Sequence, residues 1–193
     1  VLESENLIYE SARKGKILIP VFAVGRSQEV MLVLEKACME GKLDNMPVYL
    51  DGMILEATAI HASHPKYLTN DLRRSLMQND DTNPFTSKWF KQVQGRDMRE
   101  SIVLDPSPCI VLATSGMMNG GPIMEYFRNW AAVERNSLCF VGYQAEGTLG
   151  RRLQKGFGEV PLKIDGLTHM VKVGCEMVTI DGFSGHSDRR QLI

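Results

Sequence analysis

The feature that most constrains the fold is a set of short, continuous apolar runs, each followed by a stretch with helical periodicity. The run "KILIPVF" at residues 16–22 precedes an amphipathic stretch at 28–39, and "CIVLATSG" at 109–116 precedes "PIMEYFRNWAAVE" at 122–134. A strand whose apolar residues are continuous rather than alternating is buried on both faces of its sheet. Helical stretches of this length serve as crossovers between parallel strands. The sequence therefore predicts an α/β domain with a mostly parallel sheet and helices on both faces, in a Rossmann-like three-layer arrangement.

Other segments extend this pattern or depart from it. "PVYLDG" at 47–52 and "SLCFVGYQAEG" at 137–147 are strand-and-loop segments of the same kind. After residue 158, short strands follow one another with Gly-containing turns between them, which predicts a meander of antiparallel strands near the C-terminal end. Residues 79–108 are polar and interrupted by proline, so we expect short helical turns there or an excursion that packs on something else, with a surface insertion as the alternative.

The composition limits the classes of partner and compartment. With 193 residues, of which 44% are hydrophobic, the chain is expected to form a single domain over residues 1–193. Its 22 basic and 23 acidic residues give no overall positive field for nucleic-acid binding, so any phosphate must be held locally. The longest apolar run is too short to span a bilayer and the first residues are polar, which predicts a cytoplasmic protein without membrane contact. Four widely spaced cysteines without a CxxC motif are expected to be reduced.

Three strand-to-helix loops are expected to form a ligand site together. Ligands of open parallel sheets bind beyond the carboxyl ends of the strands, and "AVGRSQE", "ATSGMMNGGP" and "GYQAEGT" each follow a predicted strand and enter a predicted helix. In the second loop, Gly116 and Gly120 let backbone amides approach a ligand, Ser115 supplies a hydroxyl, and the helix amino terminus that follows favours anions. These features predict a phosphate cradle, although a tight turn without a ligand would carry the same glycines. The loop matches neither a Walker loop nor a GxGxxG fingerprint.

Charged residues and histidines near these loops are further candidates. Arg26 begins a predicted helix and could be a bidentate partner for phosphate or carboxylate; the alternatives are a solvated helix-end arginine and a clamp on the sheet rim. Glu146 would repel a phosphate, so we assign it to orienting a neighbouring side chain. His61 and His64 share one helix face, but the sequence declares no third ligand, so we expect helix-end histidines and no metal site.

The segment "GFSGHSD" at residues 182–188 contains a histidine between small residues. Asp188 can fix the tautomer of His186, while Gly185 and Ser184 leave its ring uncovered, as a general acid or a phosphate contact requires. Ser184 is itself a candidate phosphate contact. From these residues alone, a histidine in an ordinary surface turn is the alternative.

The order of several separated segments resembles a known family. "LIPVFAVGRSQE", "VYLDGMILEATAIH", "NPF", "ATSGMMNGGP", "GYQAEGTLGRR" and "GFSGHSD" occur in the order found in the β-CASP domain of metallo-β-lactamase-fold nucleases. The sequence is most similar to archaeal homologues of the endonuclease subunit of the cleavage and polyadenylation specificity factor. The resemblance covers essentially the whole chain, and its specificity rests on the agreement of all six segments.

This resemblance implies a two-domain nuclease in which the β-CASP module caps a metallo-β-lactamase domain and RNA enters between them. Two zinc ions would activate the attacking water. "SGHSD" matches the second β-CASP motif, so His186 is expected to act catalytically at the scissile phosphate, and residues 114–121 are expected to face the nucleic-acid backbone. The HxHxDH zinc motif is absent from the sequence, as are the first and third β-CASP motifs. We therefore expect an excised β-CASP domain whose zinc ligands lie mainly outside this chain, and which does not cut RNA alone.

The resemblance also implies partners outside the chain, namely KH RNA-binding domains and a second copy of the parent protein. One alternative is a non-catalytic RNA-binding or scaffolding subunit of a cleavage complex, against which the intact "SGHSD" argues. Another is a Rossmann-type nucleotide-binding module, against which the missing GxGxxG argues.

Overall fold

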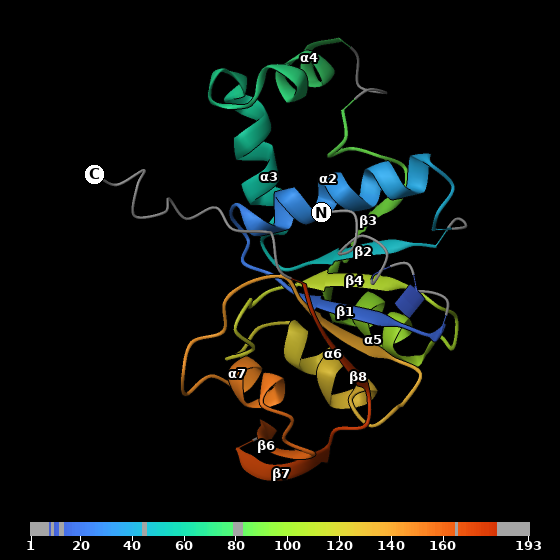
Figure 1. Ribbon diagram of the computed structural model, residues 1–193, viewed down its shortest axis with the longest axis vertical. Coiled ribbons are helices and arrows are strands. Elements are labelled where there is room, and N and C mark those ends of the chain that lie inside the picture. Colours follow the sequence, from blue (N-terminus) through green and yellow to red (C-terminus); the bar gives the residue numbers. More distant parts are fainter. Residues whose placement is uncertain are drawn as a thin grey trace.

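The computed structural model describes residues 8, 10–11, 14–43, 46–78, 83–164 and 166–180. Its centre is a six-stranded sheet in the order β3-β2-β4-β1-β5-β8, in which every neighbouring pair is parallel (Figure 1). The strands are β1 (Ile17–Pro20), β2 (Val48–Asp51), β3 (Phe90–Gln92), β4 (Ile110–Ala113), β5 (Ser137–Phe140) and β8 (Glu176–Thr179). This sheet confirms the predicted mostly parallel α/β architecture.

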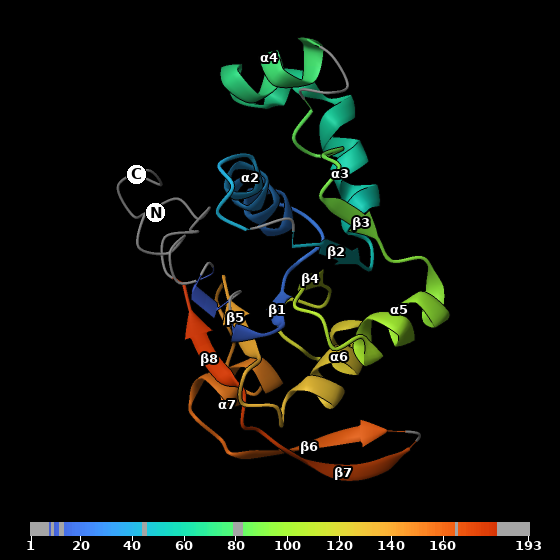
Figure 2. The same ribbon diagram turned by 90° about the vertical axis from the view of Figure 1, so that its right-hand side faces the viewer.

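Helices cover both faces of the sheet, because its central strands are apolar on both. Ile17 and Ile19 of β1 belong to one apolar cluster, whereas Leu18 points to the other face and belongs to a second. Figure 2 shows the resulting layers, with α2 and α3 on one side and α5, α6 and α7 on the other. These helices are α2 (Arg26–Met39), α3 (Ile54–Ser63), α5 (Gly95–Leu104), α6 (Ile123–Trp130) and α7 (Leu149–Gln154).

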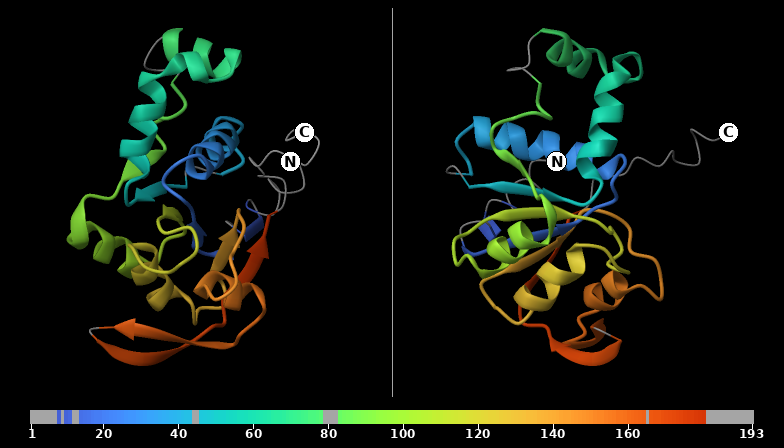
Figure 3. Two further views of the ribbon diagram at one scale, coloured as in Figure 1. Left: turned by 90° about the vertical axis from the view of Figure 1, so that its left-hand side faces the viewer. Right: turned by 180° about the vertical axis from the view of Figure 1, so that it is seen from behind.

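One helical segment projects from this layered body. α3 continues into the 3₁₀ turn η1 (Pro65–Tyr67) and then α4 (Asn70–Gln78), which lie beyond the α2 layer (Figure 3). α4 is attached to that body by Leu72 and Leu76, which pack against the apolar cluster on the α2 side of the sheet. Among the described helices, including these, none is long and apolar enough to cross a membrane.

The strands after residue 158 only partly follow the predicted meander. β6 (Glu159–Ile164) and β7 (Leu167–Lys172) form an antiparallel pair, as expected, outside the α6 and α7 layer. β8 was expected to continue this meander, and that prediction is wrong, since β8 pairs parallel with β5 in the main sheet. The cause lies in the preceding connection, where the Ala131 carbonyl accepts from Gly174 N at 2.7 Å and Cys175 N at 2.8 Å. These bonds return the chain to the amino end of the sheet, so the next strand runs parallel to β5.

The polar segment at residues 79–108 is more regular than its sequence predicts. Within its described part, 83–108, β3 forms an edge strand of the sheet and α5 packs over the adjacent face. β3 has only three residues, and Lys91 and Gln92 are exposed. A short, exposed edge strand carries no apolar run, and for this reason the sequence pattern does not reveal it.

Candidate nucleic-acid interface

The loops after β1, β4 and β5 meet at one edge of the sheet. These three strands are adjacent and parallel, so their carboxyl ends lie together. We call residues 21–25, 114–122 and 141–148, which follow those ends, the rim. The middle loop touches both others: Gln144 Nε2 donates to the Gly116 carbonyl at 2.8 Å. A Cβ on Gly116 would lie 2.9 Å from the backbone nitrogen of Phe22. The three loops therefore form one surface, as the sequence predicts.

Ser115 shapes the middle loop from within. Its hydroxyl donates to the Gly120 carbonyl at 3.0 Å and accepts from the Asn119 amide at 3.2 Å. The Ser115 amide also donates to the Gly120 carbonyl, at 3.2 Å. The hydroxyl that the sequence suggested as a ligand contact is thus engaged in closing the loop.

The amides at the end of the same loop point to anion binding. Within the described part of the chain, the N–H groups of Gly120 and Gly121 donate to no acceptor. Gly121 has φ +82°, and a Cβ there would lie 2.7 Å from the Thr114 carbonyl oxygen, so only glycine fits this position. α6 begins at Ile123, directly behind these amides. Unpaired amides at a helix amino terminus are suited to a phosphate oxygen.

Arg26 joins two parts of the rim. It is the first residue of α2, its side chain is 15% exposed, and it forms an ion pair with Glu29 of the same helix. Gly142, in the loop after β5, lies beside it, since a Cβ at Gly142 would be 3.7 Å from Arg26 Nε. The guanidinium is therefore positioned over the β5 loop, and its charge is shared with a carboxylate.

Glu146 organises the outer part of the rim. It accepts from Lys155 Nζ at 2.9 Å and from Arg151 Nε at 3.1 Å. These hydrogen bonds hold the pKa of the Glu146 carboxyl below its usual value. The next helix, α7, is capped by Thr148, whose hydroxyl oxygen accepts from the Arg151 amide at 3.2 Å. The contacts of Glu146 are thus with neighbouring cations of its own segment.

β8 brings the chain back to the same edge. It runs parallel to β5, and the amide of Ile180, just after β8, donates to the Phe140 carbonyl at 2.8 Å. Ser184, His186 and Asp188 lie outside the described residues. His186 follows Ile180 by six residues, a stretch that spans at most roughly 20 Å when extended. The parallel pairing of β8 therefore brings the chain to the rim shortly before the candidate catalytic histidine.

The described residues do not fit the two-zinc site that the resemblance implies. Among them, no group of three or more His, Cys, Asp or Glu side chains is close enough to hold a metal ion. His61 Nδ1 lies 2.7 Å from the Ala57 carbonyl of its own helix. Cys38, Cys109, Cys139 and Cys175 are free thiols, as expected. No chemical step at zinc can therefore be derived from these side chains.

A buried ionic cluster supports the rim from below, and sequence reasoning missed it. Arg99 of α5 donates to both carboxylate oxygens of Asp51, from Nε at 2.7 Å and from Nη2 at 3.0 Å. The hydroxyl of Tyr126, on α6, donates to the same carboxylate at 2.8 Å. The bonds to Asp51 raise the pKa of Arg99, and burial followed by the bond to Asp51 raises that of Tyr126. The one sequence signal was an aspartate directly after the apolar run of "VYLDG".

Comparisons with known proteins agree with the earlier resemblance. A family model described as the Beta-Casp domain matches residues 27–153, and one described as the Zn-dependent metallo-hydrolase RNA specificity domain matches 170–193. The chain is 58% identical over 182 residues to the transcription termination factor FttA of Methanosarcina mazei, covering 94% of the chain and 28% of that protein. It is 54% identical over 193 residues to FttA of Methanothermobacter thermautotrophicus, covering 99% of the chain and 30% of that protein. The chain thus spans less than a third of the length of these relatives.

Proposed function

The chain belongs to the β-CASP domain family, and from this membership we infer that it forms the RNA-facing half of a zinc-dependent ribonuclease. A metallo-β-lactamase domain outside this chain would form the other half of the cleft. The matching relatives are named transcription termination factors, which supports a role in RNA 3′-end processing, termination or decay. The single observation that carries the proposal is the rim, where three loops meet and where two amides at a helix amino terminus have no acceptor among the residues that the structure describes.

The rim's own residues would bind and orient the RNA backbone. The amides of Gly120 and Gly121 would take a phosphate oxygen, and Gly116 keeps the loop in close contact with the β1 loop. Ser115 would hold the loop in this conformation, and Arg26 would add positive charge beside it. Glu146 would keep Arg151 and Lys155 in place at the outer edge.

The chemistry would occur where the chain leaves β8. His186 would donate a proton or a hydrogen bond at the scissile phosphate, Asp188 would fix its tautomer, and Ser184 would contact the phosphate. The metal chemistry of such a nuclease would come from zinc ions whose ligands lie mainly in the other domain, and the part of this chain would be to position the phosphate. The 193-residue chain alone is proposed to be inactive.

Further parts of the intact protein would supply most of the affinity for RNA. The near-neutral charge of the chain, 22 basic against 23 acidic residues, gives little general attraction for a polyanion. We therefore propose KH RNA-binding domains and a homodimer in the intact protein, which would be located in the cytoplasm.

A non-catalytic RNA-binding or scaffolding subunit is the second candidate. The observation in its favour is that the relatives' names describe a termination factor and do not mention cleavage. Such a subunit would use the rim to bind RNA and would not require His186.

Cleavage of single-stranded RNA by the intact protein distinguishes the two candidates. Replacement of His186 by Ala should reduce cleavage by at least about 100-fold, the scale of one acid–base group, with zinc content and thermal unfolding unchanged. His61→Ala is the matched control, because that histidine lies on α3 and bonds only to its own helix. Equal cleavage by wild type and His186→Ala would remove His186 from the chemistry, and no cleavage by a zinc-loaded wild type would favour the scaffolding role.

A further inference from the structure

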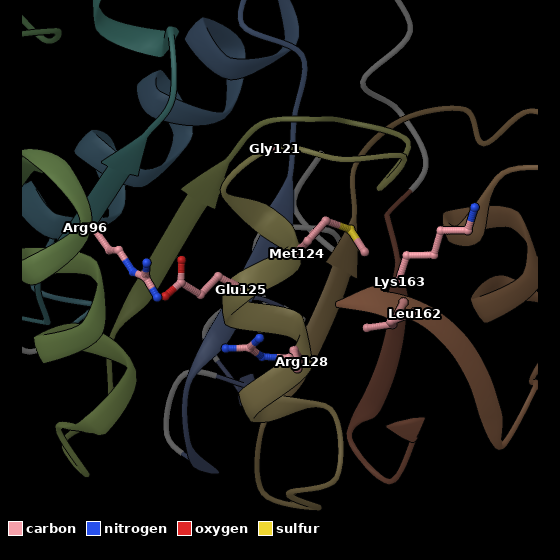
Figure 4. Close-up of a pocket in the computed structure, with 7 residues that line it drawn as sticks. All are labelled: Arg96, Gly121, Met124, Glu125, Arg128, Leu162 and Lys163. Carbon is pink, nitrogen blue, oxygen red and sulfur yellow. The ribbon is translucent and has the colours of Figure 1, made fainter. Parts of the chain in front are cut away.

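A hollow of about 270 Å³ lies beside the rim, between α5, α6 and β6. Three cationic side chains line it from three elements: Arg96 of α5, Arg128 of α6 and Lys163 of β6 (Figure 4). Figure 4 shows the two arginines on the α5 side of α6 and the lysine on the opposite side. The hollow crosses the outer face of α6, with the arginines on one side of it, whereas the Lys163 side chain extends from β6 away from α6 and places its charge at the outer margin.

The acidic groups nearby offset only part of this charge. Glu125 is the one carboxylate among the described residues that line the hollow, and it accepts from Arg99 Nη1 at 3.4 Å. Arg96 forms an ion pair with Glu100 at 2.9 Å. Among the described residues, neither Arg128 nor Lys163 has an acidic partner, and both are exposed. These two cations are therefore available to a ligand.

The hollow is continuous with the rim through Gly121. This residue lies near the end of the rim loop 114–122 and also lines the hollow. Its φ is positive and a Cβ here would lie 2.7 Å from the Thr114 carbonyl oxygen, so no side chain can project between the two sites from this position. A polyanion bound to the Gly121 amide could pass directly onto the face of α6.

We propose that this hollow is a second backbone-binding site, which holds phosphates of the same RNA strand a few nucleotides from the rim. The inference rests on the proposed function, since it takes the rim as the first site. Cations that flank the path match the repeating charge of a phosphodiester chain, and Met124 and Leu162 provide apolar contact for sugars or bases. An acidic peptide would find the same cations, but the adjoining row of unpaired amides favours a polymer of phosphates.

The test compares two lengths of single-stranded RNA, roughly 4 and 12 nucleotides, which correspond to a short site and an extended one. Binding to the intact protein is measured by fluorescence anisotropy in chelator, so that no cleavage occurs. In the Arg128→Gln/Lys163→Gln variant, affinity for the longer RNA should fall about tenfold, and its salt dependence should weaken by about 1.4 in logarithmic slope. Affinity for the shorter RNA should not change.

Lys36→Gln/Arg74→Gln is the matched control, because it removes the same charge from exposed sites on α2 and α4. An equal loss in this control would assign the effect to overall charge and overturn the inference. Wild-type affinity of the Arg128→Gln/Lys163→Gln variant for the longer RNA would also overturn the inference, and it would leave the proposed function unaffected. If the wild type binds neither RNA, the proposed function fails together with the inference. If the Arg128→Gln/Lys163→Gln variant loses affinity for polyglutamate but not for RNA, the hollow is a peptide site and the inference is overturned.

A second measurement needs no substitution. Acetylation of surface amines, followed by mass spectrometry, reports the access of reagent to each lysine. The longer RNA should protect Lys163 and the shorter RNA should not, while Lys36 on the far side of the sheet should stay reactive with both. Absence of protection at Lys163 by a bound longer RNA would contradict the proposal.

Discussion

The two ends of the central sheet differ in whether their polar groups are hydrogen-bonded within the described chain. At the amino end, Lys16 is only 5% exposed, yet its ammonium donates to the carbonyls of Ile102 at 2.8 Å and Val103 at 3.2 Å. The ammonium also lies 4.4 Å from the centre of the Trp130 ring. The Lys16 amide donates to the side chain of Asn136 at 3.1 Å. This end is closed, and its buried polar groups bond to one another.

At the carboxyl end, several polar groups have no partner in the described chain. The amides of Gly120 and Gly121 are unpaired, and Gln144 Oε1 is buried without a hydrogen bond. An unmade hydrogen bond at a buried atom such as Gln144 Oε1 is costly for stability, whereas the half-buried Gly120 and the exposed Gly121 leave their amides open to water or a ligand. The comparison suggests that the amino end contributes stability and the carboxyl end contributes binding.

The largest expected effect is at the closed end. Lys16→Met keeps the aliphatic stem but leaves the carbonyls of Ile102 and Val103 without their donor, so the free energy of unfolding should fall by about 3 kcal/mol. Denaturant titration measures this change. Lys14→Met is the control, because Lys14 is half exposed and its ion pair with Glu176 should contribute less than about 1 kcal/mol.

RNA affinity of the folded Lys16→Met protein should equal that of the wild type. A marked loss of affinity would show that the two ends are coupled and would weaken the comparison.

The open end should give a smaller loss of stability and a larger loss of binding. In Gly116→Ala the new methyl would press on the backbone of Phe22, 2.9 Å away, and should cost about 2 kcal/mol. Because the rim loops would shift, affinity for short and long RNA should both fall. Gly158→Ala is the control, since a Cβ there meets no atom within 4 Å. Unchanged RNA binding by the folded Gly116→Ala variant would show that the rim's shape is not what RNA recognises.

The smallest expected effect concerns pH. Burial raises the pKa of the Cys109 thiol, beside Lys16, from 9.0 to about 11. Because the folded state keeps this proton when the unfolded state has lost it, the contribution to stability is complete below pH 9 and is lost as the pH rises through 11. Between pH 9 and 10 the free energy of unfolding of the wild type should fall by about 1 kcal/mol more than that of Cys109→Ala. Denaturant titrations of both proteins at the two pH values measure this difference, and parallel pH curves would contradict it.

The sheet was largely predictable, because its central strands are apolar on both faces and this leaves a continuous run in the sequence. β3 was not, since an exposed edge strand of three residues has no such run. β8 was found as a strand but assigned the wrong partner. Its pairing depends on where the connection at residues 173–175 crosses the molecule, which local pattern does not encode.

The membership of the rim was also predictable, because parallel topology alone brings the three loops together. Its internal bonds were not. Gln144 reaches Gly116 over 28 positions, and Asp51 meets Arg99 over 48 positions and Tyr126 over 75. Such pairs follow from the tertiary arrangement, and in the sequence each partner is an isolated polar residue without a recognisable motif. The roles of Ser184, His186 and Asp188 remain predictions of the resemblance.

The central position of β1 also has a consequence for biosynthesis. Ile17 pairs with Ile110 on one side and with Ser137 on the other, so both neighbours of this strand come much later in the chain. At roughly 5–20 residues per second, the ribosome needs on the order of ten seconds to make them after β1. Until β4 has been made, one of the most apolar segments of the chain has no partner strand on either side. An apolar strand with free edges is open to pairing with other chains, so this stretch of synthesis is the period in which the nascent chain is most exposed to aggregation.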